Sequence, residues 1–135
     1  MTDPRSYLNF SEWPVLVMKA PPGSISDADL RTVMDHFTAE ITERGGDFVF
    51  VNDLSNSPAI TATQRQMLVE EMQRVEQLPN VRQLAVAMVF TSAIMRGMLT
   101  AVFWMRKPKH ETEIFGSAGE ALAWARERIA RAQAV

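Results

Sequence analysis

The stretch Asp47–Leu54, which reads DFVFVNDL, decides the fold class of this sequence. Its first five residues are mainly aromatic or β-branched, a composition that predicts a buried strand. A loop follows, and then a helix, because Thr61 and Gln64 have the three-residue spacing of a capping box at a helix start. A strand that leads through a loop into a helix is the repeating unit of α/β proteins.

The alternation of strand and helix continues in both directions from this stretch. Apolar runs predict strands, and apolar residues at helical spacing after a serine or threonine predict helices. The predicted order is strand 15–20, helix 26–45, strand 47–51, helix 61–77, strand 81–90, helix 92–105, strand 113–115 and a helix from 117. Residues 7–12 add a further strand, which Trp13-Pro14 separates from the strand at 15–20. The proline places this strand at the edge of the sheet. We therefore predict an α/β fold with a mostly parallel central sheet of four or five strands, an antiparallel N-terminal edge and four helices.

Length and composition narrow the functional classes. A chain of 135 residues is the size of one domain, which we expect to span residues 1–135. The net charge of −2 argues against nucleic-acid binding, and the lack of cysteine excludes disulfides and thiolate metal sites. The first ten residues do not resemble a secretory signal, and the apolar stretch 84–102 contains too many polar residues to span a membrane. The sequence predicts a cytoplasmic protein.

Three segments carry a resemblance to a known family. They are Phe48–Ser55 (FVFVNDLS), Ile60–Arg65 (ITATQR) and Phe115–Trp124 (FGSAGEALAW). With the order of elements over about the whole chain, they resemble the STAS family, the domain of anti-sigma-factor antagonists and of sulphate-transporter tails. The resemblance implies a STAS-like fold and a role as a signalling regulator that binds a protein partner, such as a kinase-like regulator.

The resemblance also implies a modification site. In the antagonist proteins the junction between loop and helix carries Asp-Ser-Ser-Gly, and the second serine is phosphorylated by the partner kinase. Those places fall on Thr61, Ala62, Thr63 and Gln64 here, so Thr63 alone keeps a hydroxyl where the family has its serines. Thr63 is therefore the possible phosphosite, and Asp53 matches the acid at the end of the family's third strand.

Two arginines stand where acidic residues are favoured. The N–H groups in the first turn of a helix carry a partial positive charge, yet Arg65 and Arg96 lie in or near that turn of the second and third long helices. Both helices leave the carboxyl edge of the sheet, where open α/β sheets usually bind ligands. Alternatively, each arginine extends into water or pairs with a local acid. The predicted surface for a partner or anion consists of Asp53, Ser55, Thr61, Thr63, Arg65 and Arg96, with Asp53 shaping the loop by accepting backbone N–H bonds.

The predicted helix 92–105 is apolar on nearly every side. Such a helix is either buried or part of an interface, so a deep core helix is one alternative. The others are a homodimer surface, which we favour, a partner groove and a lipid-like pocket. The residues for the apolar interface or ligand are Met95, Met98, Leu99, Phe103 and Trp104.

Motifs for catalysis are lacking. The sequence has no phosphate-binding glycine loop, nucleophile elbow or paired-histidine metal motif, and its two histidines, His36 and His110, have no partner at a recognisable spacing. We predict no catalytic residue, no cofactor and no metal. The predicted function is a non-catalytic regulatory module for protein interaction, and the alternative is a carrier for a small apolar ligand or lipid.

Overall fold

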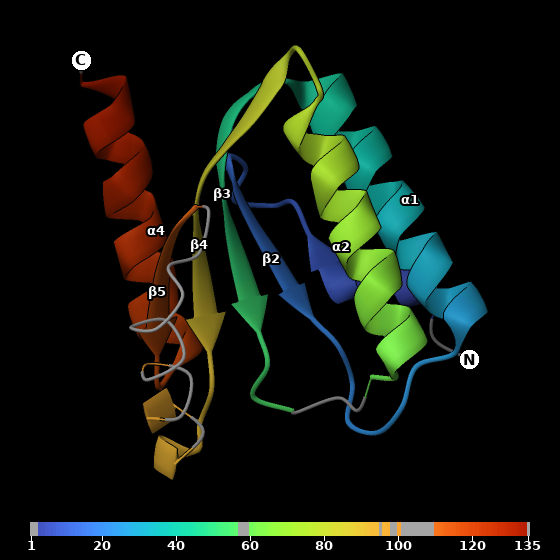
Figure 1. Ribbon diagram of the computed structural model, residues 1–135. Coiled ribbons are helices and arrows are strands. Elements are labelled where there is room, and N and C mark those ends of the chain that lie inside the picture. Colours follow the sequence, from blue (N-terminus) through green and yellow to red (C-terminus); the bar gives the residue numbers. More distant parts are fainter. Residues whose placement is uncertain (1–2, 57–59, 95, 98–99, 101–109, 135) are drawn as a thin grey trace.

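A computed structural model of the protein describes residues 3–56, 60–94, 96–97, 100 and 110–134, to which all structural statements refer. Five strands form one sheet in the order β1-β2-β3-β4-β5 (Figure 1). β1 pairs antiparallel with β2, and the other neighbours are parallel. This confirms the α/β prediction with an antiparallel N-terminal edge. The strands are β1 (Leu8–Asn9), β2 (Val15–Lys19), β3 (Gly46–Asp53), β4 (Val81–Val89) and β5 (Glu111–Phe115).

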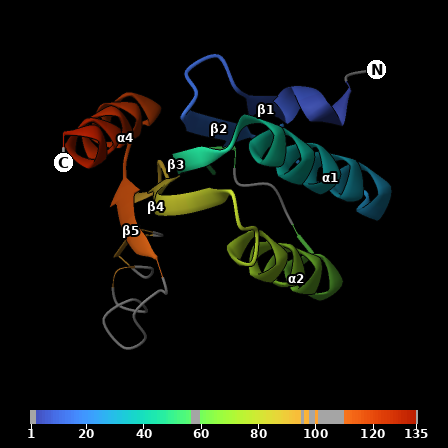
Figure 2. The same cartoon turned by 90° about the horizontal axis from the view of Figure 1, so that it is seen from above.

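Helices lie on both faces of the sheet. α1 (Asp27–Arg44) and α2 (Ala62–Glu76) lie on one face, and α4 (Ala118–Gln133) lies on the other (Figure 2). A short 3-10 helix, η1 (Pro4–Tyr7), precedes β1. The described residues thus hold three α-helices, and the predicted count of four is not matched, because the helix expected at 92–105 lies largely outside the described residues. Among the described helices, none is long and apolar enough to cross a membrane.

The predicted helix boundaries are confirmed by their caps. The Ser26 side chain accepts a hydrogen bond from the Asp29 N–H at 3.0 Å, and α1 ends at Gly45, whose φ of 68° suits glycine. At the start of α2, Thr61 and Gln64 bond each other's backbone N–H groups, both at 3.0 Å. The caps at Ser26 and Thr61 fix where the chain turns from a loop into a helix at the carboxyl edge of the sheet, whereas Gly45 ends α1 at the opposite edge, directly before β3.

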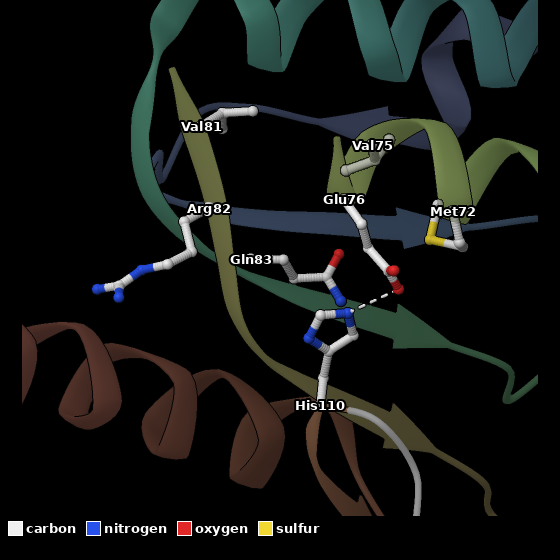
Figure 3. Close-up of a pocket in the computed structure, with 7 residues that line it drawn as sticks. All are labelled: Met72, Val75, Glu76, Val81, Arg82, Gln83 and His110. Atoms are coloured by element: carbon white, nitrogen blue, oxygen red, sulfur yellow. Dashed lines mark hydrogen bonds and ion pairs between the residues drawn. The ribbon is translucent and has the colours of Figure 1, made fainter. Parts of the chain in front are cut away.

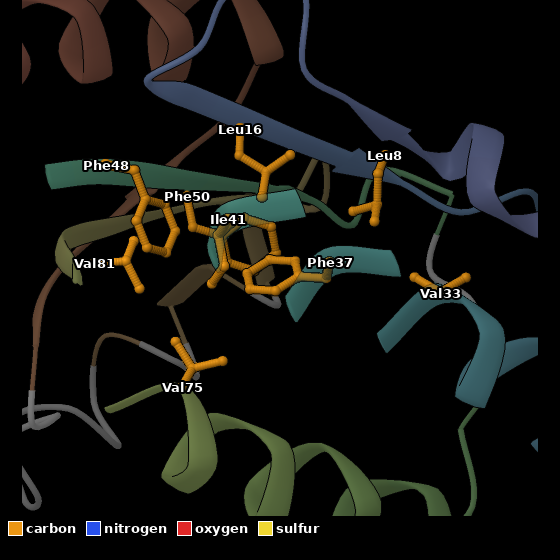
Figure 4. Close-up of a cluster of buried hydrophobic side chains, with 9 residues drawn as sticks. All are labelled: Leu8, Leu16, Val33, Phe37, Ile41, Phe48, Phe50, Val75 and Val81. Atoms are coloured by element: carbon orange, nitrogen blue, oxygen red, sulfur yellow. The ribbon is translucent and has the colours of Figure 1, made fainter. Parts of the chain in front are cut away.

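One apolar core lies on each face of the sheet, between the strands and the helices that cover that face. The first lies between the sheet and α1 with part of α2, and it contains Leu8, Leu16, Val33, Phe37, Ile41, Phe48, Phe50, Val75 and Val81 (Figure 4). The second, between the sheet and α4, contains Val15, Val49, Val51, Ala85, Ala87, Val89, Ala121, Ala125 and Ile129. Alternate residues of β3 serve opposite cores, as the two-residue repeat of a strand requires.

The buried face of α2 is partly polar. Val75 is buried and Met67 and Leu68 are partly exposed, whereas Gln64 and Glu71 are each only 2% exposed. The reason is that α2 places these two polar residues where they find partners: Gln64 caps the helix, and Glu71 accepts a hydrogen bond from Thr38 of α1 at 2.8 Å.

Candidate functional site

The best-supported site lies at the carboxyl edge of the sheet, where β3 passes into α2. Asp53, the last residue of β3, is 3% exposed. Its Oδ1 accepts the Ser55 N–H at 3.0 Å, which forms a turn, and its Oδ2 lies 3.9 Å from Lys19 Nζ. Asp53 therefore shapes the loop through a backbone N–H, as the sequence suggests, and Lys19 is a partner that the sequence reading missed.

Side-chain contacts fasten this junction to the neighbouring β2–α1 loop. The Asn56 amide donates to the Ala20 carbonyl at 2.8 Å. The Gln64 amide donates to the Ile25 carbonyl at 2.7 Å and to Asp27 Oδ1 at 3.0 Å. Because Gln64 is buried, breaking these bonds would leave polar groups without solvent. The start of α2 is therefore held in one position before any partner arrives.

The outer side of the same junction is open to solvent. Thr61, Thr63 and Arg65 are exposed, and Ile60 is 38% exposed. Arg65 makes no side-chain hydrogen bond or ion pair with any described residue. An apolar side chain, two hydroxyls and an exposed cation thus stand on a fixed helix start whose first turn contains no acidic residue.

Arg96 is arranged differently. Its Nη1 donates to the Phe90 carbonyl at 2.7 Å and to the Thr91 carbonyl at 3.1 Å. It also packs against Gly116, because a Cβ placed there would lie 3.1 Å from Nη1. Arg96 thus turns to backbone carbonyls and not to water, and it pairs with no acid among the described residues, so it follows neither of the two alternatives given from the sequence. It braces the end of β4 against the turn between β5 and α4.

The predicted residues share an edge but do not form one pocket. Asp53 points to the α4 face, since it follows Val49 and Val51 at two-residue spacing and both valines belong to the α4 core. Thr63 and Arg65 belong to α2, and Thr61 is its N-cap, on the opposite face of the sheet. Figure 1 draws the start of α2 and the residues after β4 well apart along the edge. No contact joins Arg65 to Arg96 among the described residues.

The predicted apolar surface lies outside this description. Met95, Met98, Leu99, Phe103 and Trp104 all fall outside the described residues. Their assignment to a homodimer, a partner groove or a ligand pocket therefore stays a prediction.

A hollow of about 300 Å³ lies at the other end of the sheet. It is formed by the end of α2, the start of β4 and His110, which precedes β5 (Figure 3). Within it, His110 Nε2 lies 3.3 Å from Glu76 Oε1. The sequence showed no partner for His110, because Glu76 lies 34 positions away and no local pattern connects the two residues.

Arg82 lines the rim of this hollow, but its guanidinium is paired with Asp47. Its Nε and Nη2 bind the two carboxylate oxygens of Asp47 at 3.1 and 2.9 Å. These hydrogen bonds raise the pKa of Arg82 above its ordinary value, so its guanidinium stays charged and paired.

Acidic residues do not assemble into a metal site in the described part of the chain, where no group of three or more potential ligands occurs. Glu111 and Glu113 do lie on one face of β5, since they pair with Ala85 and Ala87. However, Arg128 donates to Glu111 at 2.7 Å, so this carboxylate is part of an ion pair with α4.

No family model, curated protein or solved structure matches this chain. The STAS-like resemblance therefore rests on the three sequence segments quoted above.

Proposed function

We propose that this protein is a non-catalytic regulatory module of STAS-like type, which recognises a protein partner through the junction of β3 and α2. The observation that carries the proposal is the exposed Arg65 on a helix start that buried hydrogen bonds hold in place. A surface organised before binding loses less conformational entropy when the partner arrives.

The chemistry of this junction favours a partner that presents an acidic or phosphorylated group beside an apolar side chain. The free N–H groups in the first turn of α2 and the Arg65 guanidinium both attract an anion. Ile60 offers apolar area next to them. Thr63 is exposed, so a kinase can reach it, and phosphorylation there would place negative charge at a helix start. The partner's identity and a homodimer stay predictions.

The proposal is tested by reversing the charge of Arg65. We expect Arg65→Glu to weaken capture of the cellular partner at least tenfold, measured by quantitative mass spectrometry against tagged wild-type protein. Arg131→Glu is the matched control, because Arg131 is also exposed but lies in the last turn of α4.

A photo-crosslinking residue placed at position 63 adds an independent readout. It should label the same protein that Arg65→Glu loses, whereas a crosslinker at Glu127 on α4 should not. Equal capture by the two charge variants, or equal labelling from positions 63 and 127, would contradict the proposal.

A further inference from the structure

The hollow between α2, β4 and His110 has the composition of a small-molecule site. Its volume of about 300 Å³ is at the lower end of the range for ligand pockets, ~300–1,000 Å³. It lies at the amino end of β4, away from the junction that we propose for protein recognition. A ligand here would therefore be a property separate from partner binding.

The inner lining is apolar. Val75 and Val81 are 4% and 8% exposed, and the partly buried Met72 adds a flexible thioether that can adjust to a ligand's shape. Apolar walls of this size favour a compact hydrocarbon body over a charged or strongly hydrated one.

One polar pair, Glu76 and His110, determines which hydrogen-bonding atom of the histidine faces a ligand in the hollow. The Glu76 carboxylate lies 3.3 Å from His110 Nε2. Because a carboxylate accepts hydrogen bonds, it favours the tautomer that carries the proton on Nε2. Nδ1 is then an acceptor. Figure 3 shows it pointing away from Glu76, and it makes no hydrogen bond with a described residue.

The charges around the hollow argue against an anionic ligand. Arg82 is directed away from His110 in Figure 3, and Asp47 holds it through two hydrogen bonds. The Gln83 amide on the β4 side is neutral. What the described wall offers a ligand is therefore an acceptor at His110, the uncharged Gln83 amide and the Glu76 carboxylate, whose negative charge also disfavours an anion.

We infer that this hollow binds a small neutral molecule with an apolar body and one hydroxyl, of the phenol class, whose O–H donates to His110 Nδ1. An aromatic ring of this kind has two flat apolar faces for Met72, Val75 and Val81. The hydroxyl supplies the donor that Nδ1 requires.

The test compares phenol with toluene, which replaces the hydroxyl by a methyl group of similar size. NMR titration of the wild-type protein would follow the Met72 methyl and the His110 ring signals. We expect both probes to shift Met72 and phenol to bind about three- to tenfold more tightly, since a hydrogen bond contributes about that much. In His110→Phe, which keeps an aromatic ring but lacks the acceptor, phenol should lose its advantage and toluene should bind at least as tightly, because the buried hydroxyl then has no partner.

His36→Phe is the matched control, because His36 contacts Phe10 and does not line the hollow. It should keep the wild-type preference for phenol. If His110→Phe fails to fold, His110→Gln serves as the second variant and should reduce the preference without abolishing folding. The inference is overturned if neither probe shifts Met72 up to its solubility limit, or if phenol keeps its advantage when His110 is replaced.

Discussion

At the scale of single residues, Gly116 leaves room for the Arg96 guanidinium because it has no side chain. A Cβ at this position would lie 3.1 Å from Arg96 Nη1, closer than ordinary van der Waals contact. The same nitrogen donates to the carbonyls of Phe90 and Thr91. The absence of a side chain at Gly116 thus permits the guanidinium to brace two turns at the carboxyl edge.

We therefore predict that Gly116→Ala lowers the free energy of unfolding by about 0.5–1.5 kcal/mol, the contribution of one hydrogen bond. Urea denaturation measures it. Gly119→Ala is the control, since Gly119 lies in α4 with nothing within 4 Å of the added Cβ. It should stabilise the protein by up to about 1 kcal/mol, because alanine favours a helix more than glycine does. Changes of the same sign in both variants would contradict the bracing role of Arg96.

At the scale of elements, Glu71 links α2 to α1. Its side chain is 2% exposed and accepts hydrogen bonds from Thr38 at 2.8 Å and from Arg74 at 3.0 Å, and Arg31 lies 3.8 Å away. The carboxylate is buried, while the two arginine side chains are 45% and 60% exposed. Glu71, Arg31 and Arg74 should consequently contribute unequal amounts to the free energy of unfolding.

We expect Glu71→Ala to cost about 1.5–3 kcal/mol of stability, since it removes hydrogen bonds to a charged group and leaves Thr38 without its partner. Arg31→Ala and Arg74→Ala should each cost less than about 1 kcal/mol, because exposed cations are screened by water. Thermal unfolding of the three variants distinguishes these values. An arginine that costs as much as Glu71 would show that the ion pairs, and not the buried bond to Thr38, hold the helices together.

At the scale of the whole molecule, the sequence predicted what depends on local patterns. The apolar strands and the helix starts at Ser26 and Thr61 are properties of short segments, and each is confirmed. The α/β class followed because helices between strands require parallel pairing.

The sequence did not predict contacts that depend on how distant segments align. Lys19 meets Asp53 because β2 and β3 pair in that register, and Glu76 meets His110 across 34 positions. The Arg96 guanidinium turned to nearby carbonyls in place of solvent, which a charge pattern alone does not reveal. The first two contacts belong to the candidate sites and the third occupies Arg96, and all three depend on the folded backbone.

The central claim is that the junction of β3 and α2 is organised before a partner binds. Amide hydrogen exchange of the unbound protein, followed by NMR, tests it most directly at Ser55 and Gln64. Their N–H groups donate to Asp53 and Thr61. The account predicts exchange at least about a hundredfold slower than in an unstructured chain at both amides, because hydrogen bonds protect them. Exchange of both amides at the unstructured rate would show that the surface forms only on binding and would contradict the account.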